Sequence, residues 1–484
     1  VYKRQIQVTI DTSAPEALLQ VEPPHSLGQP VADYTSQRVL PLTDGQFLLS
    51  WVAEVPELPI SDPPVSESRI RLQRFDKLSG HIGSFYEITE PVVGYASPQV
   101  LSLGSSGNFV VCWVGEDVVP GQDQDEASPQ GDEAPAAVQQ VIFYQRFNAS
   151  ATPLDALPVR IDASFGEEFD ELALTALNED GAWAVAWCMD WGTELLVQRM
   201  GPTPPNEGAS GDEGPGYGPL DDPLVIQVPD TAGLSDPQWL ALPSASAEPA
   251  DKHFVLVWEA DASDEWTDIF WQRFDGDGQA IDLQPVRLPR PAEEEGDEPD
   301  DLEDVEILAL GAGGSFVLLY ESDDNESSVN RIFVSHVNPD DVVTDTQLVV
   351  TPDGQDLYAR SPQAIALSDD SFVMTWVQGE NWWDRQAWVQ LFTVNDAGDV
   401  TPAPAYRLPA PTDESTVDDW QVMAWHDGGF LVSLIVEDGL YGEYDETTEF
   451  YITVQTFDAL GRPLDGPHRL TGDATGNAWW LDTT

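Results

Sequence analysis

Hydrophobic residues recur along this chain in short runs that are apolar at almost every position. The first type of run begins with an aromatic residue, continues with small or aliphatic residues, and usually ends with a second aromatic. Seven copies align: FLLSW from Phe47, FVVCW from Phe109, WAVAW from Trp183, FVLVW from Phe254, FVLLY from Phe316, FVMTW from Phe372 and FLVSL from Phe430. Runs of this length and composition, bounded by Gly, Asp, Asn and Pro, predict β-strands.

A second run follows each copy of the first. Its seven copies are IRLQRFD from Ile70, IFYQRFN from Ile142, LLVQRM from Leu195, IFWQRFD from Ile269, IFVSHVN from Ile332, AWVQLF from Ala387 and ITVQTFD from Ile452. A third element precedes each first run, as in residues 97–103 and 361–367, and a short fourth follows each second run, as in 158–161 and 285–288. Each repeat therefore predicts four short strands.

Strands that are apolar on both faces must be covered on both faces. Four-stranded sheets packed side by side meet this requirement, which predicts an all-β fold, a seven-bladed β-propeller with four antiparallel strands per blade. The expected blades span about 31–92, 93–164, 165–230, 231–290, 300–352, 358–410 and 416–472. A linear β-solenoid or a string of separate sandwiches is the alternative.

Residues 1–30 and 473–484 lie outside the predicted blades. The chain begins with Val, and VYKRQ resembles the translated adapter remnant found at the ends of metagenomic contigs, so we expect a module of a longer protein, monomeric in itself. The stretch IQVTI (6–10) either ends a preceding domain or joins the last blade to close the ring.

Charge narrows the range of partners. Asp and Glu number 86 against 20 Lys and Arg, a formal net charge of −66. Such a surface repels phosphate backbones and anionic lipids, which argues against nucleic-acid binding. No apolar run reaches the length of a membrane-spanning helix, so we expect no direct membrane insertion. The two cysteines, Cys112 and Cys188, are predicted to be buried and to form no disulfide.

The loops differ between the two ends of the predicted blades. The turns that join the first strand to the second and the third to the fourth are mostly short and rich in Gly and Asp, which indicates a structural role. At the other end the connections vary, and variable loops on a rigid scaffold commonly bind ligands. Trp382, Trp383, Tyr441 and Tyr444 lie in two such loops and are the candidate ligand-binding residues. The alternative is that they cap their blades.

Motifs for catalysis are absent from the sequence. It contains no nucleophile elbow, zinc-protease motif, phosphate-binding loop or dinucleotide-binding glycine pattern. Carboxylate pairs suitable for glycoside hydrolysis are too common among 86 acidic residues to discriminate. We therefore expect no catalytic residues and no enzyme, with no cofactor. Asp275, Asp277 and Asp282 in DGDGQAID are weak calcium candidates, because the loop lacks the EF-hand spacing and already reads as a hairpin turn.

The second run carries a recurrent Gln-Arg pair: Gln73 and Arg74, Gln145 and Arg146, Gln198 and Arg199, and Gln272 and Arg273. A pair that repeats with the period of the fold predicts a hydrogen-bonding role within each repeat.

The pattern GGF-V-x-W followed by QRFD-x-x-G resembles the repeats of very large bacterial secreted and surface proteins, including adhesins, and residues 6–17 resemble the end of a bacterial Ig-like domain. The resemblance covers residues 36 to about 471 and transfers no catalytic residue. It implies an extracellular or cell-surface location and a non-catalytic binding, adhesion or scaffold module for a glycan or protein ligand. A polysaccharide-active propeller enzyme and a structural spacer are the alternatives.

Overall fold

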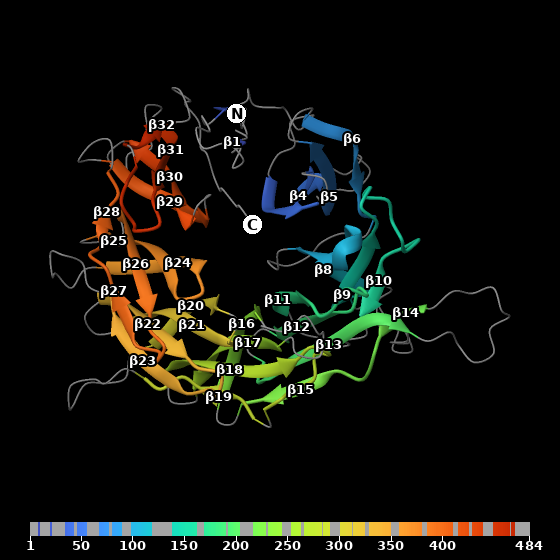
Figure 1. Cartoon of the computed structure of the whole chain (residues 1–484). Helices are drawn as coiled ribbons and strands as arrows, with labels where there is room; N and C mark the ends of the chain where they lie inside the picture. Colours follow the sequence, from blue (N-terminus) through green and yellow to red (C-terminus); the bar gives the residue numbers. More distant parts are fainter. Residues whose placement is uncertain are drawn as a thin grey trace, which may run out of the picture. The chain divides into compact units, whose positions relative to one another are not determined.

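The computed structural model is all-β, and its described residues contain one short 3-10 turn and no α-helix (Figure 1). It describes residues 8–9, 20–21, 34–42, 46–55, 67–76, 80–89, 98–118, 138–161, 169–189, 192–203, 216–228, 231–243, 253–262, 266–282, 284–290, 301–311, 313–324, 329–349, 358–379, 385–409, 415–424, 428–438, 449–464 and 466–469. Within these ranges the strands form seven antiparallel sheets of four or five strands and a two-stranded ribbon.

The chain divides into two compact units, residues 30–239 with 484, and residues 1–29 with 240–483. The first unit contains three sheets. Sheet 1 is β3 (Tyr34–Pro41), β4 (Gln46–Val55), β5 (Glu67–Asp76) and β6 (Gly80–Glu87). Sheet 2 is β7 (Gln99–Leu103), β8 (Asn108–Val118), β9 (Val138–Phe147) and β10 (Val159–Ile161), with η2 (Gly104–Ser106) between β7 and β8. Sheet 3 is β11 (Phe169–Ala176), β12 (Trp183–Met189), β13 (Glu194–Thr203), β14 (Gly216–Pro219) and β15 (Leu224–Gln227).

Four further sheets follow along the chain. Sheet 4 is β16 (Thr231–Leu242), β17 (His253–Ala262), β18 (Thr267–Asp275) and β19 (Val286–Arg287). Sheet 5 is β20 (Asp301–Leu310), β21 (Ser315–Asp324), β22 (Val329–Val337) and β23 (Val343–Leu348). Sheet 6 is β24 (Tyr358–Ser368), β25 (Ser371–Gly379), β26 (Gln386–Val394), β27 (Val400–Pro402) and β28 (Tyr406–Arg407). Sheet 7 is β29 (Ser415–Ala424), β30 (Phe430–Asp438), β31 (Glu449–Phe457) and β32 (His468–Arg469).

The ribbon near the N-terminus pairs β1 (Val8–Thr9) with β2 (Gln20–Val21). Within the described residues β1 therefore pairs with β2 and not with the last sheet. The outer strands of sheet 7 are β29 and β32.

Alternate side chains of the second strands enter two different cores, as the two-faced pattern predicts. In β8, Phe109, Val111 and Trp113 pack with residues of sheet 1, while Val110, Cys112 and Val114 pack with residues of sheet 3. The same alternation occurs in β21, whose even-numbered residues 316–320 face sheet 4 and whose Val317 and Leu319 face sheet 6. Successive sheets within a unit therefore share hydrophobic cores in a β-propeller-like arrangement.

The aromatic residues of the first motif pair with aromatics on the third strand of the same sheet. Phe372 lies opposite Phe392 with ring centroids 5.0 Å apart, and Phe430 lies opposite Phe457 at 4.7 Å. Stacked rings at directly opposite positions add to the burial of each ring. The spacing of the two motifs thus sets the register of the central strands.

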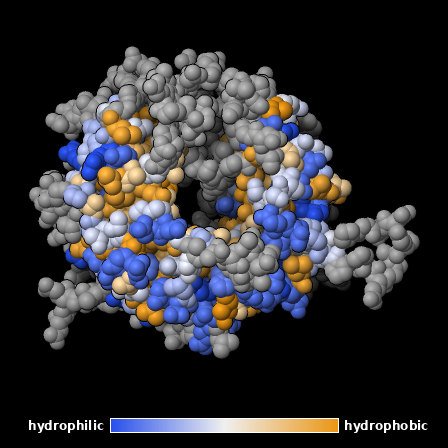
Figure 2. All heavy atoms as spheres, viewed as in Figure 1, coloured by the Kyte–Doolittle hydropathy of each residue, from blue (hydrophilic) through white to orange (hydrophobic). Residues whose placement is uncertain are grey.

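Both cysteines are buried and neither forms a disulfide, as predicted. On the face shown in Figure 2, hydrophilic residues cover much of the described surface, with hydrophobic residues among them.

Candidate active site

One face of sheet 5 carries a row of carboxyl groups directed toward sheet 6. Across the β20 and β21 pair, Asp301 lies opposite Asp323 and Glu303 lies opposite Glu321, while Glu306 lies opposite Leu319. Residues opposite each other on paired strands share a face. Because Leu319 packs in the core shared with sheet 6, the carboxyl groups on its face also point toward sheet 6. We call Asp301, Glu303, Asp304, Glu306, Glu321 and Asp323 the carboxyl cluster.

A bulge in β20 gives the carboxyl cluster its shape. The register with β21 shifts between Glu303 and Glu306, and Asp304 has a left-handed backbone with φ of 52°. The backbone N–H of Val305, in the middle of this bulge, donates to Oε1 of Glu259 in sheet 4 at 3.1 Å. A bulge re-aims the side chains beside it. Here Asp304 is exposed, whereas Glu303 and Glu306 are half-buried and Val305 is buried.

Glu321 is the buried member of the carboxyl cluster, with none of its surface exposed. Its carboxylate accepts hydrogen bonds from the backbone N–H of Ser361 in sheet 6 and from Nδ2 of Asn330 at 3.1 Å. Burial, with a smaller contribution from the hydrogen-bonded carboxyl of Asp304, raises the pKa of Glu321 to about 8. The protonated form of Glu321 is therefore favoured relative to an ordinary glutamate.

Glu306 differs because it is only half-buried and so remains open to a ligand. Burial raises its pKa to about 7. The pKa of Glu303 is also raised, first by burial and then by Asp304, Asp323 and Asp301. An acid whose pKa lies near the working pH is suited to proton transfer.

Arg360 of β24 supplies positive charge beside the cluster. Its Nη2 lies 3.6 Å from Asp323 Oδ2 and its Nε 3.9 Å from Glu321 Oε2. A guanidinium favours the ionised form of a neighbouring carboxyl. The cluster thus combines a group protonated near pH 7 with carboxylates beside a cation, the separation of roles that acid and base chemistry requires.

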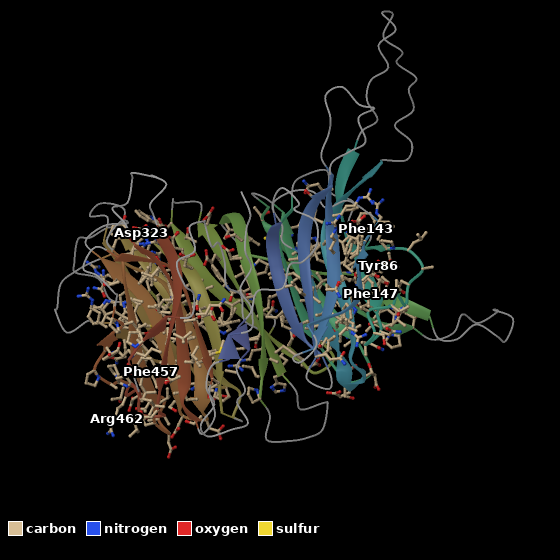
Figure 3. The ribbon with its side chains drawn as sticks, turned by 90° about the horizontal axis from the view of Figure 1, so that it is seen from above. Tyr86, Phe143, Phe147, Asp323, Phe457 and Arg462 are labelled. Atoms are coloured by element: carbon tan, nitrogen blue, oxygen red, sulfur yellow. The ribbon has the colours of Figure 1, made fainter. Side chains whose placement is uncertain are left out.

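The cluster lies at the end of sheet 5 where the variable connections were predicted. Asp323 is near one end of the sheets of its unit, whereas Phe457 and Arg462, beside a turn from third to fourth strand, are near the other (Figure 3). The expected location of a working face is therefore consistent with the cluster, although the residues differ.

The aromatic candidates Trp382, Trp383, Tyr441 and Tyr444 lie outside the described residues, so their role remains a prediction. Asp275, Asp277 and Asp282 are described. Oδ1 of Asp275 accepts hydrogen bonds from the N–H groups of Asp277 and Gln279 at 3.0 and 2.9 Å, and Oδ2 of Asp282 accepts from the N–H of Arg273 at 3.0 Å. These carboxylates are thus engaged in forming the turn.

Asparagine builds the same turn elsewhere. Oδ1 of Asn338 accepts from the N–H groups of Asp340 and Val342, at 2.9 and 3.0 Å. No group of three or more His, Cys, Asp or Glu side chains arranged to hold a metal ion occurs among the residues with a described position. Calcium binding at DGDGQAID remains a prediction.

The recurrent glutamines hydrogen-bond within their own sheets, as predicted. Nε2 of Gln145 donates to the carbonyl of Asp155 at 3.0 Å, and Nε2 of Gln272 donates to that of Asp282 at 2.8 Å. The arginines next to them are less uniform. Arg146 pairs with Asp155 of its own sheet, whereas Arg273 pairs with Asp341 of the next.

The carboxyl cluster is not among the sites that the sequence predicted. One signal was present: Glu259 and Glu321 each directly follow the second aromatic of the first motif, in FVLVWE and FVLLYE. A carboxyl group at the same position of a buried strand in two consecutive repeats indicates a shared contact.

No family model and no curated protein matches the chain. Among solved structures it is similar to a protein of unknown function from Dyadobacter fermentans, with 12% identity over 74% of this chain and 93% of that one and a TM-score of 0.38. It is similar to the NanB sialidase from Streptococcus pneumoniae, with 10% identity over 84% of this chain and 65% of that one and a TM-score of 0.37. It is also similar to an α-L-arabinofuranosidase from Fusarium graminearum, with 13% identity over 74% and 91% and a TM-score of 0.32.

These comparisons correct the functional expectation. The sequence predicted a non-catalytic adhesion or scaffold module and no enzyme. The comparisons contradict this prediction, since the sialidase and the arabinofuranosidase are glycoside-cleaving enzymes. They agree better with the polysaccharide-active alternative. The chain spans less than two thirds of the sialidase, and at these identities and TM-scores its chemistry must be argued from its own residues. Among the described residues, no helix has the length and hydrophobicity needed to cross a membrane.

Proposed function

We propose that this chain is a glycan-active enzyme of propeller fold, in which the carboxyl cluster on sheet 5 hydrolyses a glycosidic bond. The observation that carries the proposal is Glu306, a half-buried carboxyl group whose pKa is raised to about 7 beside ionisable carboxylates on the same face. In this assignment Glu306 donates a proton to the leaving oxygen. Asp304, which is exposed, acts as the carboxylate that attacks or that activates water.

Asp304 and Glu306 are two residues apart on β20, so both lie at its bulge. Glycoside hydrolases use two carboxyl groups that flank the scissile bond. Acetal hydrolysis also suits a site built of carboxyl groups, because it needs a proton donor and a carboxylate, whereas acyl transfer needs an activated nucleophile.

Burial of Glu321 supports the same assignment. Its carboxyl hydrogen-bonds to Asp304 and to the Ser361 backbone, so it positions the bulge that carries both proposed catalytic groups. Glu321 itself has no exposed surface, which makes it a positioning residue.

Three finer points belong to the same proposal. The seven sheets form one seven-bladed propeller, which is supported by the seven sequence repeats and by second strands whose two faces enter different cores. The chain acts on glycans outside the cell, as part of a longer bacterial secreted or surface protein, supported by the repeat resemblance. The module itself is monomeric.

The test is hydrolysis of a panel of neutral polysaccharides and aryl glycosides, followed by reducing-sugar release and chromophore release. We expect turnover by the wild type and a loss of at least about 100-fold in kcat for Glu306→Gln, the usual size of a general-acid contribution. The matched control is Asp340→Asn, an exposed carboxylate at the opposite end of the same sheet. Absence of turnover on the whole panel, or full activity of Glu306→Gln, contradicts the proposal.

A further inference from the structure

A second feature lies in the other unit, between sheets 2 and 3, at the end of the sheets that was predicted to be purely structural. It is a cleft of about 260 Å³, lined on one side by Ser106, Asn108 and Arg146 and on the other by Glu179, Asp180 and Tyr217. Leu103, Leu154 and Pro202 contribute apolar surface. We call this the Arg146 cleft.

The floor of the cleft is an arginine stacked on a tyrosine. The Arg146 guanidinium lies 3.6 Å from the centroid of the Tyr217 ring, and the Tyr217 hydroxyl donates to the carbonyl of Gly181. Tyr217 belongs to β14, which pairs with the end of β13. The insertion at 201–222 is rich in Gly, Pro and acidic residues, a composition typical of flexible loops. Its described part forms the pairing of β13 with β14 and brings the aromatic ring of Tyr217 to Arg146 of the neighbouring sheet.

Arg146 is held at the cleft by Asp155 and Tyr217. Its Nε contacts both oxygens of Asp155, at 3.2 and 3.0 Å, and its Nη2 lies 2.5 Å from Asp155 Oδ1. The guanidinium also forms a side-chain hydrogen bond with Tyr217. The ion pair and the stack therefore hold the planar guanidinium in place at the edge of the cleft.

Arg273, between sheets 4 and 5, occupies the position equivalent to Arg146 in a repeat without the insertion. There Arg273 donates from Nη1 to the carbonyl of Gly314 at 2.9 Å and from Nη2 to that of Asn338 at 2.8 Å. Its Nε donates to Asp341 at 2.6 Å. All three guanidinium nitrogens of Arg273 thus donate hydrogen bonds to residues of the next sheet. In sheet 3, among the described residues, the ring of Tyr217 lies beside Arg146, and Arg146 pairs with Asp155 of its own sheet.

The chemistry of the cleft selects its ligand. The fork of Arg146 that would bind a carboxylate is already occupied by Asp155, and Glu179 and Asp180 add two further negative charges. An anionic ligand is therefore disfavoured. The lining combines donor groups (the Arg146 guanidinium and the Asn108 amide), acceptor groups (the carboxylates of Glu179 and Asp180) and apolar surface, which matches a neutral ring bearing hydroxyl groups.

The volume of the cleft also favours a single sugar ring as the ligand. The volume is below the roughly 300 to 1,000 Å³ of pockets for drug-sized ligands, so the cleft suits one sugar ring rather than an extended chain. We propose that the Arg146 cleft is a binding site for a single neutral sugar unit of a glycan, separate from the carboxyl cluster. It goes beyond the proposed hydrolysis because it requires binding without cleavage.

The experiment uses the full chain and methyl glycosides of glucose, galactose, mannose and xylose, with methyl glucuronide as the anionic probe. Saturation-transfer NMR and intrinsic tryptophan fluorescence report binding. We expect at least one neutral glycoside to bind and the glucuronide to bind at least ten-fold more weakly than its neutral counterpart.

The blocking variant is Ser106→Tyr, which fills the cleft from an exposed turn, and its control is Ser105→Tyr, in the same turn but outside the lining. Binding should be lost in the first and retained in the second. Arg146→Lys, which keeps the charge but loses the planar stack, should weaken binding at least ten-fold, with circular dichroism confirming the fold. Absence of binding by every neutral glycoside, unchanged binding by Ser106→Tyr, or preference for the glucuronide overturns the proposal. Each of these readouts is independent of hydrolysis, so the two proposals fail separately.

Discussion

Oε1 of Glu259 accepts a hydrogen bond from the backbone N–H of Val305, 3.1 Å away, at the bulge of the next sheet. Glu321, at the same position one repeat later, accepts from the N–H of Ser361, one position earlier in the corresponding bulge because the next residue is Pro362. Both Asp304, just before Val305, and Ser361 have left-handed backbones, with φ of 52°. A buried carboxyl group thus holds an irregular part of the neighbouring first strand in two successive sheets, and irregular backbone persists only where its surroundings hold it.

The first prediction concerns Glu321 and pH. Its folded-state pKa, raised to about 8, lies above the ordinary value of 4.5, so the folded state binds the proton more tightly than the unfolded state. Stability from this group is therefore fully present below about pH 4.5 and is lost as pH rises toward 8. Glu321→Gln, which mimics the protonated acid, should flatten the pH dependence of the unfolding free energy over this range.

Chemical denaturation at several pH values measures this effect. The amide introduced by Glu321→Gln can also donate to the buried Oδ1 of Asn330, which has no hydrogen-bond partner. Glu321→Ala, which removes every partner, should cost about 2 to 4 kcal/mol. A wild-type slope that survives in Glu321→Gln would show that Glu321 is not the titrating group.

The second prediction is the pH profile of the proposed hydrolysis. Burial raises the pKa of Glu306 to about 7, and a general acid acts only while it holds its proton. The rate should therefore decline as pH rises through about 7. Measuring kcat from pH 5 to 9 checks this, and a rate that increases across the same interval would exclude Glu306 as the proton donor.

The third prediction concerns two glycines with similar left-handed backbones, Gly104 and Gly83, with φ of 64° and 72°. A Cβ at Gly104 would overlap the backbone carbonyl of Glu179 in the next sheet, whereas a Cβ at Gly83 would meet nothing within 4 Å. Gly83→Ala should cost only the left-handed strain, about 1 to 2 kcal/mol. Gly104→Ala should cost clearly more, as a larger fall in the midpoint of thermal unfolding. Equal falls in both variants would show that the two sheets do not approach closely there.

The sequence was sufficient for the architecture of each sheet because the evidence is local and repeated. Phe109 and Trp113 enter one core while Cys112 enters another, and this follows from alternation in a strand that is apolar at every position. The role of Gln145 follows in the same way, since a residue repeated with the period serves the repeat.

The sites could not be predicted in the same way because they depend on contacts between sheets. Glu306 is one of 86 acidic residues, and only the bulge and the neighbouring sheet distinguish it. Tyr217 reaches Arg146 from 71 positions along the chain, through an insertion whose composition indicates flexibility. Arg146 and Arg273 occupy equivalent positions, yet one pairs within its own sheet and the other with the next.

The fourth prediction concerns the thiols. Cys112 and Cys188 have no exposed surface, and burial raises the pKa of the Cys112 thiol well above its usual range. Thiolate is the reactive form, so both should resist a thiol reagent in the folded protein. Ellman's reagent should detect essentially no thiol in native buffer and both thiols in denaturant. Rapid labelling of Cys112 in the native protein would indicate that the core shared by sheets 2 and 3 opens readily.

The last prediction follows from net charge. A formal charge of −66 repels anionic polysaccharides at distances up to about the Debye length, ~30 Å at 0.01 M salt and ~8 Å at 0.15 M. If the chain cleaves glycans, kcat/KM at low salt should be higher for a neutral polysaccharide than for its uronate-rich counterpart of the same linkage. Added salt should narrow the gap by raising the rate on the acidic substrate, because screening weakens the repulsion that slows encounter. Assays at 0.01 and 0.15 M salt on the matched pair measure both rates. An acidic substrate that is preferred at low salt and loses its advantage as salt is added would instead require a local positive surface that outweighs the net charge.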